Sequence, residues 1–195
     1  MADPAYIDAD GVLVDGEAWV ALSTTEPTGT KLVSMTSAND GSSLDWSQYM
    51  DLVVIVASKS VKASGDTDTL LGHFNNDGTT NYQVNYYAAD GASFYVSRTT
   101  AAFMNLGNSL TEDANAAASA SLIWRIFDIN SGKYKNSTTQ WACDKNGTGS
   151  WTVGLYPFVW QSTAAITEID LDMEDANYDT GTMISLFGVL PRMVS

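Results

Sequence analysis

Short apolar segments separated by turn-forming residues run through most of this chain. Within many of them apolar and polar residues alternate, which places every second side chain on one face of a strand. Asp77-Gly78 and Asp90-Gly91 stand between such segments, and an Asp-Gly pair favours a tight hairpin turn. Turn signals recur about every 8–12 residues, without a sustained helical period or a fixed repeat. The pattern predicts an all-β fold, a jelly-roll-like β-sandwich, with these two pairs as its clearest hairpins.

Four segments have the composition of central strands. The first is almost continuously β-branched, and we expect its strand to be buried on both faces. In the second, Trp124 and its neighbours two residues away form one face. The third and fourth flank an acidic connector that ends in glycine. In chain order the four segments are Asp51–Val61, Ser121–Ile129, Ala165–Met173 and Thr182–Val189.

Two other segments are less regular. Trp151–Trp160 is an aromatic strand that contains Pro157, and proline in a strand favours a sheet edge or a bulge. Asn108–Ala120 is rich in small polar residues and alanine, and we expect a loop there.

The N-terminal part differs from the rest of the chain. Its apolar residues come in short islands between acidic residues and glycines, too short to form a core of their own. We expect residues 1–43 to form an arm with short strands and residues 44–195 to form the β-sandwich. The apolar islands must be covered either by the arm's own domain or by a neighbouring subunit. They supply the candidate partner-binding residues, which are Tyr6, Ile7, Val12, Leu13, Val14 and Trp19.

Charge and composition exclude several classes of protein. The net charge is −14, whereas nucleic-acid binding and anionic membrane surfaces both require clustered lysine and arginine. No apolar stretch approaches the roughly 20 residues of a membrane span, and the N-terminus lacks the apolar core of a signal peptide. Cys143 is the single cysteine, so no internal disulfide forms. We expect a protein made in a cytoplasm that stays soluble or joins an assembly.

Catalytic and metal-binding patterns are largely missing. His73 is the only histidine, it lies in an apolar strand, and no Gly-x-Ser-x-Gly motif accompanies it. One histidine and one cysteine do not furnish a transition-metal site. Acidic residues cluster in two turn-like segments, where solvated loop charges are the favoured interpretation and a calcium site is the weaker one. These residues are Asp66, Asp68, Asp172, Glu174, Asp175 and Asp179. We expect no catalysis, no cofactor and no bound metal.

Aromatic residues leave two interpretations open. An exposed row of rings on a β-sandwich binds sugars by stacking, whereas buried rings fill the core and subunit interfaces. We favour the second interpretation. The candidates for a sugar platform are Trp141, Trp151, Tyr156 and Trp160.

The segment AITEIDLDMEDANYDTGTMISLFGV, residues 165–189, carries a family resemblance. It resembles the C-terminal signature Gly-Ser/Thr-x-x-x-Leu-Tyr/Phe-Gly of a family of tailed-phage virion proteins. Weaker similarity extends upstream to Leu44–Val61 and to Asn81-Tyr82. The chain departs from the family in having Phe187 where tyrosine is commoner, and in continuing through Leu190–Ser195.

The resemblance implies a β-sandwich that decorates (cements) the outer capsid surface by bridging capsomers, or a tail-associated structural protein. It further implies a virion location, the major capsid protein as partner, and a homotrimer at local threefold positions. The alternative function is a tail-associated carbohydrate- or receptor-binding module. A glycan-cleaving enzyme is a third hypothesis and would require two acids facing each other across a cleft.

Overall fold

The computed structural model describes residues 6–7, 13–14, 19–65, 67–112, 114, 118–144 and 151–190. Within these residues the regular secondary structure is β-strand, apart from one turn of 3-10 helix, Trp46–Gln48. In this part of the chain no helix is both long and apolar enough to cross a bilayer. The strands are β1 (Tyr6–Ile7), β2 (Leu13–Val14), β3 (Trp19–Thr25), β4 (Leu32–Thr36), β5 (Asp51–Ala57), β6 (Thr67–Phe74), β7 (Tyr82–Asp90), β8 (Ser93–Ala101), β9 (Met104–Leu110), β10 (Ser119–Phe127), β11 (Lys135–Asp144), β12 (Trp151–Trp160), β13 (Glu168–Met173) and β14 (Met183–Val189).

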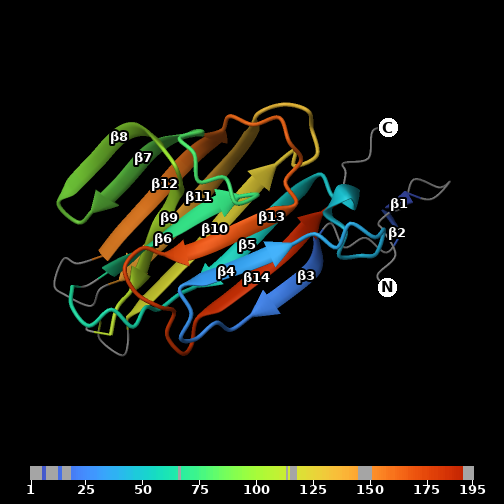
Figure 1. Cartoon of the computed structure of the whole chain (residues 1–195). Coiled ribbons are helices and arrows are strands. Elements are labelled where there is room, and N and C mark those ends of the chain that lie inside the picture. The colour runs from blue at the N-terminus through green and yellow to red at the C-terminus, as the bar shows by residue number, and fades with distance from the viewer. Residues whose placement is uncertain are drawn as a thin grey trace.

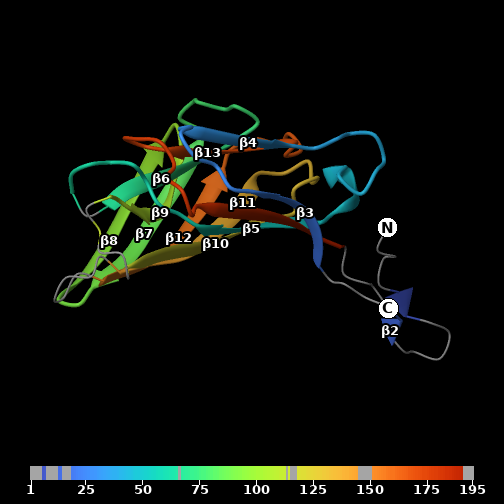
Figure 2. The same cartoon turned by 90° about the horizontal axis from the view of Figure 1, so that it is seen from below.

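Two antiparallel sheets pack face to face, as Figures 1 and 2 show from two directions. The large sheet has eight strands in the order β3-β14-β5-β10-β11-β12-β7-β8. The small sheet has four, in the order β4-β13-β6-β9. Among the described strands, β1 and β2 pair only with each other. The predicted all-β sandwich is confirmed.

The strand pairing is nested, so that early strands meet late ones. β3 pairs with β14, β4 with β13, β5 with β10, and β6 with β9, all antiparallel. These pairs form one long ribbon, which is rolled up so that β14 also pairs with β5 and β13 with β6. A rolled antiparallel ribbon divided between two sheets is the jelly-roll arrangement that the sequence predicts.

The four predicted central strands lie inside the sheets. β5, β10 and β14 are interior strands of the large sheet, and β13 is an interior strand of the small sheet. β5 ends at Ala57 and β13 begins only at Glu168, so both strands are shorter than expected.

Two hairpins are inserted into the roll and widen the large sheet. β7–β8 follows β6, and β11–β12 follows β10; together they continue the sheet outward from β10 as β11-β12-β7-β8. The predicted hairpin at Asp90-Gly91 is confirmed, because β7 and β8 pair on either side of it. The large sheet therefore extends past the small one, and β8 is its outermost strand (Figure 1).

The turn at Asp77-Gly78 is not a hairpin, contrary to the expectation. β6 before it belongs to the small sheet and β7 after it to the large sheet. The Asp77 carboxylate accepts hydrogen bonds from the Thr79 amide, the Asn81 side chain and the Trp160 indole N–H. These bonds fix the chain where it crosses from one sheet to the other.

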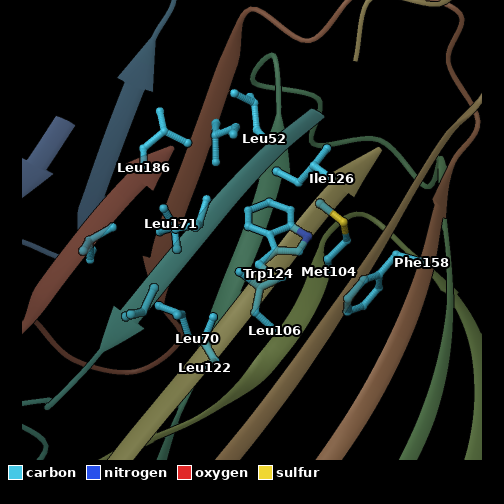
Figure 3. Packing of buried hydrophobic residues seen from close by; sticks show 14 of the residues in the cluster. Leu52, Leu70, Met104, Leu106, Leu122, Trp124, Ile126, Phe158, Leu171 and Leu186 are labelled. Carbon is cyan, nitrogen blue, oxygen red and sulfur yellow. The ribbon is translucent and has the colours of Figure 1, made fainter. Parts of the chain in front are cut away.

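Trp124 on β10 lies near the centre of the core (Figure 3). Its ring stacks on Phe74 of the small sheet at a centroid distance of 5.2 Å, and both side chains are fully buried. Leu122 and Ile126 are buried on the same side of β10, so the predicted alternation of this strand is confirmed. Met104 and Leu106, from β9, cover the core from the small sheet.

Trp141 on β11 fits between two glycines. A Cβ added at Gly154 would lie 2.3 Å from its Nε1, and one added at Gly107 would lie 2.6 Å from its Cγ. Gly107 also has a φ of 141°, which side chains rarely adopt. The indole is accommodated because neither neighbour carries a side chain.

The sandwich begins earlier in the chain than the sequence indicates. Residues 19–43 are expected in the arm, whereas β3 pairs along β14 and β4 pairs along β13. Their partner strands lie at the far end of the chain, so no local pattern links them.

Two local expectations are also wrong. β12 lies between β11 and β7 rather than at an edge, and its pairing with β7 skips Tyr156 and Pro157 because proline has no amide hydrogen. The loop expected at 108–120 is wrong at its two ends, because β9 runs to Leu110 and β10 begins at Ser119, whereas the described residues between these strands are not in strands.

Candidate binding face

The large sheet has one open face. Its inner face packs on the small sheet, and none of the described strands covers its outer face (Figure 2). On β5, Val54 points inward and is fully buried, whereas Ile55 points outward and is 41% exposed. The expectation that this strand is buried on both faces is therefore wrong at Ile55 and Ala57. A β-branched segment typical of a doubly covered strand here faces solvent on one side.

Apolar side chains cross this outer face in two neighbouring rows, which we call the apolar belt. The strand registers place Ile55 beside Ile123, and Leu155 beside Tyr87. Gln140 on β11 lies between the two pairs. The second row lies two residues further along each strand, on the same face. The apolar belt comprises Ile55, Ile123, Leu155, Tyr87 and Val96 in the first row, and Met183, Val153 and Phe94 in the second.

Exposed large apolar side chains concentrate on this face. Of the 13 that are exposed among the described residues, nine point outward from the large sheet by the alternation of their strands. Besides members of the apolar belt, they include Trp151 on β12 and Trp19 on β3. Two shallow hollows flank Gln140, one lined by Ile55 and Ile123 and the other by Tyr87, Phe94 and Leu155. The outer face is therefore apolar and uneven rather than polar and flat.

The outer face is electrically balanced although the chain is strongly acidic. By alternation its strands direct two acidic side chains, Asp51 and Asp144, and two basic ones, Arg98 and Arg125, to this side. The whole chain carries −14. Negative charge therefore gathers elsewhere on the molecule.

One place where it gathers is the outer face of the small sheet. β13 directs Glu168, Asp170 and Asp172 to that side, while its other residues enter the core. Asp170 is 2% exposed and accepts a hydrogen bond from Ser34 Oγ at 2.5 Å. Burial raises the pKa of Asp172, although Lys31 and His73 act to lower it.

The acidic connector after β13 is tied down by lysines. Lys59 pairs with Asp179 at 2.8 Å, and Lys62 pairs with Asp175 at 2.5 Å. The hydrogen bond from Lys59 lowers the pKa of Asp179. These carboxylates hold one loop against another and do not face each other across a cleft.

Asp68 is not a solvated loop charge, contrary to the expectation. It lies in β6, is 2% exposed, and accepts a hydrogen bond from Ser60 Oγ at 2.6 Å. The backbone amides of Thr69, Asp175 and Ala176 also donate to its carboxylate. Four donors replace the water that burial removes, so Asp68 anchors the acidic connector. Asp66 lies outside the described residues. Among those described, no three or more His, Cys, Asp or Glu form a group that could hold a metal ion.

The residues considered for chemistry and sugar binding are dispersed. His73 lies on β6 between the rings of Tyr82 and Phe103, each at 6.4 Å. Cys143 is buried. Of the four candidates for a sugar platform only Trp151 is exposed, whereas Trp141, Tyr156 and Trp160 are buried. The four rings therefore form no common exposed row.

The partner-binding residues predicted from the sequence are only partly described. Trp19 begins β3 and is 39% exposed, and its ring lies 5.9 Å from that of Phe187 on the outer face of the large sheet. Tyr6 and Ile7 pair with Leu13 and Val14 through their backbones. Val12 lies outside the described residues.

The apolar belt is not among the features predicted from the sequence, although the sequence contains two signals for it. The β-branched segment of β5 and the outward residues Ile123, Val153 and Leu155 are apolar where a solvated strand face would be polar. No protein-family model and no curated protein matches the chain.

Proposed function

We propose that this chain is a non-enzymatic structural protein of a tailed-phage virion, a decoration protein that binds the outer surface of the capsid. The resemblance of residues 165–189 to a virion family suggests the class. The apolar belt is the structural observation that supports a binding role. A wide apolar surface without net charge is suited to a protein partner and is costly to leave in water.

The proposed partner is the major capsid protein, and the proposed contact surface is the outer face of the large sheet. A rigid sheet presents its side chains with little loss of conformational entropy on binding, which favours many weak contacts repeated by symmetry. Acidic residues on the opposite face would point away from the shell and oppose unspecific clustering. Bridging of adjacent capsomers would then stabilise the head.

We further propose that three copies group at local threefold positions, as the resemblance implies. Trp19, in β3 at the edge of the large sheet beside Phe187, is the predicted partner-binding residue that would take part in contacts there. Closed symmetry would cover sheet edges that a single copy leaves open.

The alternative, a tail-associated carbohydrate- or receptor-binding module, has less support. Sugar recognition by stacking needs exposed coplanar rings, and three of the four candidate rings lie in the core. Of the four candidates Trp151 alone is exposed, and the exposed rings of Tyr87 and Phe94 belong to the apolar belt.

A matched pair of leucines tests the proposal. Leu155, 44% exposed, lies in the apolar belt, and Leu32, 47% exposed, lies on the small sheet. Purified protein is added to phage heads that lack it, and bound protein is measured by co-sedimentation. We expect Leu155→Asp to weaken binding by at least about tenfold, because a carboxylate would enter an apolar contact, and Leu32→Asp to bind like the unaltered protein.

Two results would contradict the proposal. Equal binding by both variants would exclude the outer face of the large sheet as the contact surface. Failure of the unaltered protein to bind heads, together with labelling of tails in electron micrographs of virions, would instead favour the tail-associated alternative.

A further inference from the structure

The four edge strands of the sandwich differ in how well they are protected. β3 and β9 each have a register shift against their only neighbour, and β4 has five residues. β8 has nine residues, which pair with β7 throughout without a shift. It contains no proline, and Arg98 is its only charged residue. Bulges, short length and charge are the usual means by which an edge strand avoids pairing with another chain. Of the four edge strands, β8 is the least protected by these features.

β8 also lacks cover on its two faces. Eight of its nine residues are exposed. Phe94 and Val96 are 69% and 62% exposed on the outer face of the large sheet, and Tyr95 is 51% exposed on the other side. A strand with one neighbour and two wet faces gains little from its own chain. Its apolar residues therefore indicate a partner beyond its free edge.

The hairpin turn determines which backbone groups that edge presents. A two-residue turn, Gly91 and Ala92, joins Asp90 to Ser93. Such a turn closes with a hydrogen-bonded pair, and bonded pairs then occur at every second residue. The odd-numbered residues of β8 thus exchange hydrogen bonds with β7. The even-numbered residues, Phe94, Val96, Arg98 and Thr100, direct their N–H and C=O groups away from it.

We propose that two copies of the chain pair antiparallel through their β8 strands, about a twofold axis at Ser97. In this register Phe94 faces Thr100 of the second copy and Val96 faces Arg98. These are the residues whose backbone groups point outward, so each pair forms two hydrogen bonds. Any shift by one residue would lose this match. The register thus covers the whole strand and satisfies its free groups.

The side chains are compatible with the same register. Tyr95 faces Thr99 of the second copy, an aromatic and β-branched pair that favours antiparallel strands. No residue of β8 is acidic, so the charge that repels whole chains is absent from this edge. Arg98 and its copy are diagonal rather than opposite, and the aliphatic part of each lies against Val96. The two large sheets become one continuous sheet.

This twofold contact is independent of the capsid proposal. It uses the edge of the sheet, whereas the proposed shell contact uses the face. Pairing through β8 is isologous and joins two chains, whatever threefold grouping also exists.

A cysteine at the proposed axis tests the contact. Ser97→Cys places two thiols in a pair without backbone hydrogen bonds, where cross-strand Cα atoms are about 4.5 Å apart, within disulfide range. Ser93→Cys is the matched control: the same residue type on the same face of β8, but opposite Ala101 of the second copy. The native thiol of Cys143 is buried and gives little background.

After mild oxidation we expect Ser97→Cys to run as a covalent two-chain species on a denaturing gel and Ser93→Cys to remain a single chain. Light scattering of the unaltered protein over a dilution series should show reversible pairing. Equal cross-linking of both variants, or none of Ser97→Cys, would overturn the proposed register.

A second pair of variants tests the hydrogen bond that the N–H of Val96 would donate to the second copy. Val96→Pro deletes an N–H that points away from β7, whereas Val96→Thr keeps it and preserves the β-branched shape. We expect Val96→Pro to weaken association by at least about tenfold and Val96→Thr to retain it. Unchanged association of a folded Val96→Pro variant would exclude this edge. Should Val96→Pro fail to fold, the cysteine pair still decides.

Discussion

The two outer faces of this sandwich have opposite chemistry. On the small sheet, β13 sends its apolar residues into the core and directs Glu168, Asp170 and Asp172 outward. On the large sheet, the strands send apolar residues in both directions, so that Trp124 is buried on one side of β10 and Ile123 lies in the apolar belt on the other.

An antiparallel sheet that borders water usually alternates apolar and polar residues. β13 of the small sheet follows this rule, with apolar residues in the core and acidic residues on the other side. The large sheet follows the pattern of a sheet with layers on both sides, yet the described chain supplies only one layer. The difference teaches that the core of this chain accounts for the apolar residues of β13 but not for the outward apolar residues of the large sheet, which under the proposed function contact a partner.

The largest expected effect is the difference between an aspartate on the core side of the large sheet and one on its open side. Leu122→Asp or Ile184→Asp places a carboxylate in the core, and we expect loss of soluble expression because an unpaired buried charge is costly. Ile123→Asp changes the neighbouring residue on the open side, and we expect a folded protein with less than about 1 kcal/mol lost. Soluble yield measures the effect of the core variants, and urea unfolding followed by tryptophan fluorescence measures that of Ile123→Asp.

Either reversal would break the comparison. A folded Leu122→Asp variant would mean that the inner face is not the core. An unfolded Ile123→Asp variant would mean that part of the same chain covers the outer face.

Local patterns predicted the strands well and their partners poorly. The alternation around Trp124 separates the two sides of β10, and Asp90-Gly91 marks a turn whose two strands are neighbours. Asp77-Gly78 has the same composition, but its strands enter different sheets, and the Asp77 carboxylate accepts a hydrogen bond from Trp160 of a distant strand.

The apolar belt was harder to predict for a related physical reason. A β-branched segment such as β5 indicates that its residues avoid water. It does not indicate which part of the fold, or which partner, covers them. Ile55 and Val54 look equivalent in sequence, and only the layer order of the fold separates an open face from a core face. Asp68 illustrates the converse, because its donors come from loops that meet only in the folded chain.

A smaller effect is expected where packing is tight under the open face. Gly154 lies on β12 between outward Val153 and Leu155, and a methyl group there would lie 2.3 Å from the Trp141 ring. We expect Gly154→Ala to lower the free energy of unfolding by about 1–3 kcal/mol through overpacking. Binding to heads at a temperature where the variant is folded should stay unchanged, since the apolar belt keeps its side chains. Thermal unfolding and co-sedimentation measure the two quantities, and a loss of binding without a loss of stability would contradict this separation.

The smallest effect concerns the acidic face. Burial raises the pKa of Asp172 above its ordinary value, so the folded state binds the proton more tightly than the unfolded state does. This contribution to stability is present below the ordinary pKa, about 3.9, and is lost as the pH rises through the folded-state value. At neutral pH the ionised carboxylate therefore opposes folding, and Asp172→Asn should raise the free energy of unfolding by less than about 1 kcal/mol. The gain should shrink toward zero in acid, where Asp172 is protonated and resembles asparagine, and urea unfolding at acidic and neutral pH measures it. A loss of stability at neutral pH would instead mean that Lys31 or a bound cation holds the carboxylate favourably. Binding to heads should not change in this variant, because the acidic face would point away from the shell.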